Sequence, residues 1–273
     1  MFLALNGATT MRADLETDLR VAHFAGFDAI EIWAAKLRAY AKRQTLRELR
    51  AALERYGLRA YSINSIEHIT FRSPERWSEL LAECEQLCAM AREIGCEYLV
   101  LVPSPRPEGV SEEAIREESV RVLSELSDVA ARYGVNLAFE FLGFPECSVR
   151  TLTAGWEIVR RVARPNVGLV LDTFHFYVGG SSLDALAELD PERLFIVHLN
   201  DAEDRPKSEL RDEHRLLPGL GILPLREIWS RLRALGYDRG VSVELFRPEY
   251  WEWDPAELAV RAKAAAERVL ERA

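Results

Sequence analysis

The stretch Val167-Gly168-Leu169-Val170-Leu171-Asp172 is an unbroken apolar run that ends on a carboxylate. Three further short runs, apolar apart from Ser242, end on the polar residues Glu140, His198 and Glu244. A strand that is apolar along its whole length is buried on both faces, as strands of parallel sheets are. Four such strands in succession predict a closed parallel barrel, with its polar groups gathered at the carboxyl ends of the strands.

The rest of the chain repeats this alternation of short apolar runs and longer amphipathic stretches. We predict strands at residues 2–6, 28–33, 58–64, 97–102, 135–141, 167–172, 193–199 and 240–246. We predict helices at residues 13–25, 44–56, 75–94, 111–133, 151–163, 182–189, 224–235 and 254–272. Strict alternation of this kind predicts an α/β fold, a single (β/α)8 TIM barrel that forms one domain over residues 1–273.

The charge balance argues against a nucleic-acid partner. The chain has 35 Lys and Arg against 44 Asp and Glu, which gives a net charge of −9. Such a protein has no general attraction to a phosphate backbone. We therefore expect a small-molecule substrate and no nucleic acid, and self-association into a homo-oligomer stays open.

The cysteines and the amino terminus indicate the cytoplasm. None of Cys84, Cys88, Cys96 and Cys147 forms a C-x-x-C pair, so we expect small core residues rather than a zinc site. The first residues lack the basic flank of a signal peptide, and no apolar run approaches the roughly 20 residues that span a bilayer. We expect a cytoplasmic protein without a membrane partner.

The four residues at the strand ends form a candidate metal site. Glu140, Asp172, His198 and Glu244 would bring three carboxylates and one imidazole to one rim of the barrel. This set of oxygen and nitrogen donors suits one divalent ion: Mn²⁺, Co²⁺ or Zn²⁺, with Mg²⁺ also acceptable. Four protein ligands leave room for a chelating substrate only if the ion exceeds tetrahedral coordination, which favours Mn²⁺ or Co²⁺.

Other residues are placed to contact a substrate at the same rim. His175 follows Asp172 by three positions, and Arg215 lies in the long connection between residues 199 and 223, which we expect to be a lid or binding loop. Trp33 and Phe246 belong to a group of aromatic residues that follow the strands, as in many polyol pockets.

The sequence resembles the xylose-isomerase-like superfamily of sugar phosphate isomerases and epimerases. The resemblance rests on Glu, Asp, His and Glu at the fifth to eighth strands, on Asp172-x-x-His175 and on Arg215-x-x-Pro218-Gly219-x-Gly221. Within that superfamily the 2-keto-myo-inositol (inosose) isomerases are the most similar group, over nearly the whole chain. That likeness is carried by residues 6–10, 126–128, 140–147, 166–176 and 241–250.

The resemblance implies a metal-dependent isomerase that acts on a cyclic polyol ketone through an enediolate. Glu140 and Glu244 would then be both metal ligands and the acid/base pair, while His175 and Arg215 steady the substrate oxygens. We also expect Asn6, Trp33 and Phe246 to contact the substrate. A ketose 3-epimerase, a hydroxypyruvate isomerase or an inosose dehydratase would use the same ligands, so these activities stay open.

Two alternative functions from other classes of protein have less support in the sequence. An endonuclease IV-like nuclease needs several metal ions, and this chain has only five histidines. A non-catalytic sugar-binding barrel conflicts with the intact set of ligands. The sequence also departs from the inosose isomerase pattern at Gly7, Phe144 and Tyr177, where an acidic residue and two histidines are expected, on loops that should face the pocket.

Overall fold

Eight parallel strands close into a barrel in the computed structural model, which describes residues 1–271. The predicted (β/α)8 barrel is confirmed, whereas Arg272, the last residue of the predicted helix 254–272, lies outside the described residues. The strands follow one another around the barrel in chain order: β1 (Phe2–Asn6), β2 (Ala29–Trp33), β3 (Arg59–Ile66), β4 (Tyr98–Leu101), β5 (Asn136–Glu140), β6 (Val167–Asp172), β7 (Leu194–Leu199) and β10 (Gly240–Val243).

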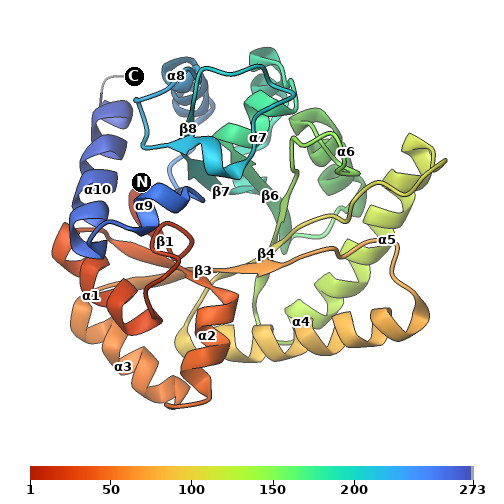
Figure 1. Ribbon diagram of the computed structural model, residues 1–273. Coiled ribbons are helices and arrows are strands. Elements are labelled where there is room, and N and C mark those ends of the chain that lie inside the picture. Colours follow the sequence, from red (N-terminus) through yellow and green to blue (C-terminus); the bar gives the residue numbers. More distant parts are fainter. Residues whose placement is uncertain (272–273) are drawn as a thin grey trace.

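Helices surround the strands, and α10 lies beside α1 so that the last helix closes the ring next to the first (Figure 1). The helices are α1 (Leu15–Ala25), α2 (Ala34–Ala41), α3 (Leu46–Tyr56), α4 (Pro74–Ile94), α5 (Glu112–Ala131), α6 (Leu152–Val162), α7 (Thr173–Val178), α8 (Leu225–Leu235), α9 (Pro248–Trp251) and α10 (Pro255–Glu271). Short 3₁₀ turns are η1 (Leu183–Glu188), η2 (Pro191–Arg193) and η3 (Asp212–His214).

Local sequence signals explain where the helices begin and end. The Ser73 side chain accepts a hydrogen bond from the amide of Arg76 and caps α4, whose first residue is Pro74. The same helix ends at Gly95, which adopts a left-handed conformation that costs a glycine little. The predicted α-helix at 182–189 is wrong in type, because η1 there is a 3₁₀-helix.

Aromatic and small side chains fill the barrel below its carboxyl rim. The Tyr98 ring packs against the rings of Tyr61 and Phe195, with centroids 5.4 and 5.1 Å away. The Tyr61 hydroxyl donates a hydrogen bond of 2.5 Å to the Phe195 carbonyl. Ala4 and Ala138 leave room for these rings inside the barrel. The interior is therefore a packed core, and chemistry is confined to the upper end.

Strand register brings the predicted metal ligands to one level and one face. Asp172 pairs directly with His198, and His198 pairs with Ser242, two residues before Glu244. Glu140 pairs with Val170, two residues before Asp172. Because side chains alternate with a period of two, paired residues and residues two apart point the same way, here into the barrel.

The long connection after β7 contains a small antiparallel sheet of β8 (Asp201–Ala202) and β9 (Arg215–Leu216). Asp201 accepts hydrogen bonds of 2.9–3.0 Å from the backbone amides of Gly219, Gly221 and Leu223. These bonds fold the connection back on itself. The hairpin thereby fixes Arg215, which we predicted to lie on a loop, at the edge of the site.

A buried ion pair anchors the loop after β1. Lys36, on the unpredicted helix α2, donates hydrogen bonds to the carbonyls of Gly7 and Thr10 and to Asp18 Oδ2, at 2.7–2.9 Å. Thr10 also donates a hydrogen bond of 2.7 Å to Asp18. All three ammonium hydrogens of Lys36 are thus used. The pair therefore holds the loop that leads from Asn6 to α1.

Replacing Lys36 with Met should destabilise the fold by about 3–5 kcal/mol, since it leaves a buried carboxylate unpaired. Burial raises the pKa of Asp18 to about 6 even beside Lys36. A raised folded-state pKa means that stability falls as the pH rises through it. Removing Lys36 raises the pKa of Asp18 further, so the loss in free energy of unfolding should be larger near pH 8 than near pH 5.

Urea unfolding at both pH values measures this effect. The double variant Lys36→Met/Asp18→Asn is the control and should recover part of the lost stability at the higher pH. Equal deficits at the two pH values would contradict a buried charge as the cause.

Two further expectations concern the cysteines and membrane spans. The four cysteines are free and buried, as predicted. Over residues 1–271, the structure contains no helix with both the length and the apolar character that crossing a bilayer requires.

Candidate metal centre

Four buried side chains converge at the carboxyl rim of the barrel. One ligand atom from each of Glu140, Asp172, His198 and Glu244 can be chosen such that all four lie within 4.8 Å of one another. His198 Nδ1 lies 3.0 Å from Glu140 Oε1, 3.3 Å from Glu244 Oε2 and 3.9 Å from Asp172 Oδ2. The structure thus brings together the four residues that the sequence analysis selected as ligands.

Glu31 holds the other nitrogen of the histidine. Both of its carboxylate oxygens lie 3.1 Å from His198 Nε2, deep in the barrel. When Nε2 carries the proton and donates it to Glu31, Nδ1 is left as a lone-pair donor that faces the three carboxylates. A carboxylate behind a histidine is the common means of fixing the tautomer of a metal ligand.

Amide side chains orient two of the carboxylates. Asn6 and Asn64 both donate to Glu244 Oε1, at 3.1 and 2.8 Å. Asn200 donates a hydrogen bond of 3.0 Å to Asp172 Oδ2. Asn6, which we predicted to contact substrate, therefore positions Glu244 in this structure.

Glu244 lies one residue beyond β10, not within a strand that continues to residue 246 as predicted. The Thr9 hydroxyl explains the change, because it donates to the carbonyl of Val243 at 2.8 Å and accepts from the amide of Leu245 at 3.1 Å. The Thr9 side chain thus takes the place of strand-to-strand hydrogen bonds at the two residues that flank Glu244. These contacts fix the backbone on both sides of Glu244 and so orient its side chain.

Arg215 is the buried cation of the site. Its Nη1 donates to Asp172 Oδ2 at 2.7 Å and to Glu244 Oε2 at 3.0 Å. Its Nη2 lies 3.1 Å from His175 Nε2, and Nε donates to Asp212 at 2.9 Å. A guanidinium is always charged, so Arg215 must be the donor to His175.

His175 consequently presents an N–H group at its other ring nitrogen. Burial lowers the pKa of His175 to about 4, so the ring is neutral near pH 7. With Nε2 accepting from Arg215, the proton lies on Nδ1, which has no hydrogen-bond partner among the described residues. His175 belongs to α7, where the Asp172 carboxylate caps the helix by accepting from the His175 amide at 2.9 Å.

The electrostatics favour positive charge at the centre of the cluster. Burial would lower the pKa of His198, but Glu244, Glu31 and Glu140 outweigh it and raise this pKa well above its ordinary value. Burial raises the pKa of Glu140 to about 7, although His198 lowers it in part. Buried carboxylates outnumber the one buried arginine, so a dication bound at Nδ1 would supply the charge that the surroundings stabilise.

A cavity of about 190 Å³ opens above the cluster. Its walls include the predicted contacts Trp33, His175, Arg215 and Phe246, together with Glu140 and Glu244. Trp33 and Phe246 meet edge to face, with ring centroids 5.7 Å apart. The site therefore joins an apolar wall to a polar floor, as small-molecule pockets do.

Of the three positions that depart from the inosose isomerase pattern, Phe144 lines this cavity and packs edge to face on His175 at 5.0 Å. Gly7 instead packs against Trp33 and Asp18, where an added Cβ would approach Trp33 to 3.1 Å. Lys207 covers the Tyr177 ring with its Nζ 4.2 Å from the centroid. Neither Gly7 nor Tyr177 is among the residues that line the cavity, so the expectation that these two face it is wrong.

Sequence reasoning missed Glu31, Asn64 and Asn200. Glu31 lies between Ile30 and Ile32 in an otherwise apolar strand, which was the available signal. Nothing local indicated that it would meet His198, because the two lie on β2 and β7, which β1 and β10 separate around the barrel. The two asparagines carried no distinctive spacing.

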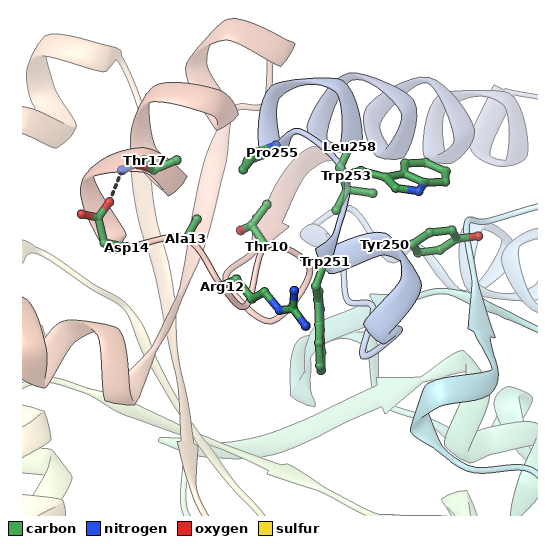
Figure 2. A pocket seen from close by; sticks show the side chains of 10 residues that line it. All are labelled: Thr10, Arg12, Ala13, Asp14, Thr17, Tyr250, Trp251, Trp253, Pro255 and Leu258. Atoms are coloured by element: carbon green, nitrogen blue, oxygen red, sulfur yellow. Dashed lines mark hydrogen bonds between the residues drawn. The ribbon is translucent and has the colours of Figure 1, made fainter.

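A larger hollow of about 440 Å³ lies on the outer side of the loop after β1, away from the carboxylates. Figure 2 shows Trp251 beside Thr10 and Arg12 in its wall. The Trp251 indole donates a hydrogen bond of 3.0 Å to the Ala8 carbonyl. This wall therefore braces the loop that follows Asn6.

The closed parallel barrel and the carboxylate–histidine cluster at its carboxyl rim place the protein in the class of (β/α)8 barrels with a candidate site for one metal ion. The model of the family described as "Xylose isomerase-like TIM barrel" matches residues 19–269, and the chain belongs to this family.

Named relatives and a solved structure cover almost the whole chain. The inosose isomerase of Bacillus velezensis is 38% identical over 272 residues, which are 99% of this chain and 97% of that protein. That of Bacillus subtilis is 37% identical over 265 residues, 96% of this chain and 95% of the relative. The crystal structure of an IolI protein with a bound zinc atom superposes with a TM-score of 0.97 at 37% identity, and it covers 100% of this chain and 99% of its own.

Proposed function

We propose that this protein is a metal-dependent isomerase of a cyclic polyol ketone of the inosose type. The observation that carries the proposal is the buried cluster of Glu140, Asp172, His198 and Glu244, in a chain 37–38% identical to inosose isomerases. The adjoining cavity suits a small, sugar-like molecule, because aromatic rings face carboxylates, an arginine and a histidine across it.

The donor set fits one divalent ion. Glu140, Asp172 and Glu244 would each contribute a carboxylate oxygen, and His198 would contribute Nδ1. Zn²⁺, Mn²⁺ and Co²⁺ accept this mixture, with Mg²⁺ a poorer match to the imidazole, and the zinc in the IolI structure supports the first. When bound, the ion supplies a Lewis acid that polarises the substrate carbonyl and acidifies the neighbouring C–H.

The side chains of the site have separable tasks in proton transfer. Glu140 and Glu244 form the acid/base pair, one removing the proton next to the carbonyl and one returning a proton at the adjacent carbon. Glu244 is held by Asn6, Asn64 and Arg215, whereas the side-chain hydrogen bond described for Glu140 is to His198 alone. Glu140 is therefore the less constrained carboxylate and the better candidate to meet the substrate proton first.

His175 and Arg215 bind substrate oxygens while the proton moves. The Nδ1–H of His175, which no described residue accepts, donates to a substrate oxygen as negative charge develops there. Arg215 holds the imidazole in this tautomer and adds a fixed positive charge. Trp33 and Phe246 cover the apolar face of the substrate ring and exclude water.

Proton NMR in D₂O tests the function directly. Purified protein loaded with Zn²⁺ or Mn²⁺ should catalyse the exchange of deuterium into scyllo-inosose beside the carbonyl and the appearance of an isomeric inosose. Inversion at the exchanged carbon with the carbonyl left in place, or turnover of ketohexoses in preference, would indicate an epimerase. Complete absence of exchange with every metal and ketone would refute the proposal.

Further properties stay predictions. The chain is expected to be one domain, to act in the cytoplasm and not to bind nucleic acid. Whether it forms a homo-oligomer is open.

A further inference from the structure

The loop between β3 and α4 forms part of the outer wall of the cavity. Glu67 and His68 line it together with Glu140 and Glu244 of the cluster. The His68 side chain is 58% exposed, whereas both cluster carboxylates are buried. His68 therefore lies toward the solvent end of the cavity, and the reacting groups lie at its floor.

His68 has a backbone conformation that is uncommon for residues other than glycine. Its φ is +56°, in the left-handed region that is uncommon for any residue but glycine, although histidine, asparagine and aspartate adopt it more often than the others. Strained residues of this kind persist only where the surroundings impose them, and they cluster at ligand sites.

The surroundings of the loop do impose this conformation. Arg72 donates to the carbonyls of Glu67 and His68 at 2.8 and 2.5 Å. The Ile69 amide donates to the Val102 carbonyl at 3.2 Å, and the Thr70 amide donates to Ser104 Oγ at 3.1 Å. The loop is therefore fixed on both sides of the strained residue.

The His68 ring is free to bind a ligand. Among residues 1–271 it makes no hydrogen bond, and its recorded polar neighbour is the Glu67 carboxylate, 3.9 Å from Nε2. An imidazole can both donate to and accept from hydroxyl groups. The loop thus holds, at the rim of the cavity, an imidazole that has no hydrogen-bond partner among residues 1–271.

Resting on the proposed function, we propose that His68 is a specificity-determining residue that hydrogen-bonds a ring hydroxyl remote from the reacting carbons of the polyol ketone. The floor of the cavity recognises the carbonyl and its neighbour, which many ketones share. His68 recognises the part of the substrate that distinguishes a cyclic polyol from a short ketone.

His68→Gly tests this role without straining the loop, since glycine adopts positive φ readily. We expect KM for scyllo-inosose to rise about tenfold, as the loss of one hydrogen bond predicts, with kcat within about twofold. Exchange into hydroxyacetone, which has the reacting groups but no remote hydroxyl, should be unchanged. Asparagine tolerates the same backbone conformation and keeps a polar group, so KM of His68→Asn should lie between those of the wild type and His68→Gly.

Calorimetric titration with myo-inositol, a cyclic polyol without the reacting carbonyl, separates this proposal from the proposed function. His68→Gly should weaken its binding to the zinc-loaded protein about tenfold, with unchanged zinc affinity and no fall in Tm. The role of His68 would be overturned if wild type and His68→Gly bound myo-inositol equally, or if the wild type did not bind it. It would also be overturned if His68→Gly lost activity with hydroxyacetone as much as with scyllo-inosose. A wild type that binds inositol through His68 but catalyses no exchange would refute the isomerase function alone.

Discussion

Glu140→Gln should reduce deuterium exchange into the polyol ketone by about 10²–10⁴-fold while the fold persists. The amide has the shape of the carboxylate and can still offer an oxygen to a metal ion, but it cannot accept the substrate proton. The change also suits the surroundings, because the side-chain hydrogen bond described for Glu140 is to His198 alone. Proton NMR in D₂O measures the rate, and circular dichroism checks the fold.

Glu146→Gln is the matched control, since Glu146 is an exposed glutamate on the same connection after β5. It should exchange at the wild-type rate. Glu244→Gln should also reduce exchange strongly, but it places an amide N–H group among the donors Asn6, Asn64 and Arg215. The loss of activity in Glu244→Gln will therefore include the effect of local rearrangement, and Glu140→Gln is the cleaner test. Wild-type exchange in Glu140→Gln would remove Glu140 from the acid/base pair.

His198→Ala should lose the bound metal ion, and Glu31→Gln should weaken zinc affinity by roughly 10–100-fold. The first change removes the nitrogen ligand. The second lets an amide N–H group point at His198 Nε2, which favours the tautomer whose proton faces the metal position. Elemental analysis after dialysis and competition with a chelator measure both effects.

His23→Ala is the control for these variants, because His23 lies on α1 and contacts the Tyr56 carbonyl away from the site. It should keep one metal ion per chain. Stoichiometric zinc in His198→Ala after dialysis would contradict the proposed ligand set. Wild-type affinity in Glu31→Gln would show that Glu31 does not select the tautomer.

The strands could be predicted because each one carries its own signal. An apolar run such as Val167–Asp172 is buried on both faces wherever it lies, so its neighbours do not alter the assignment. The helices α2 and α7 escaped prediction because each begins directly after a strand, at Ala34 and Thr173, with no intervening turn. For α7 the capping residue is Asp172, itself the last residue of the strand.

The roles within the site were only partly predictable. His175 and Arg215 were assigned to the substrate, yet each also contacts the cluster: the Asp172 carboxylate caps the helix of His175, and Arg215 donates to Asp172 and Glu244. The sequence gives no measure of which donors reach which oxygen, because that depends on hairpin geometry and strand stagger.

By itself, the sequence determined the eight-stranded barrel and the residues at the ends of its last four strands. A strand that is apolar until its final residue places that residue at the carboxyl rim of the barrel. Tertiary structure alone decided that Glu31 lies behind His198, that Asn6 serves Glu244 and that His68 stands at the mouth. These contacts join strands and loops far apart in the chain, and barrel closure, not local pattern, sets their distances.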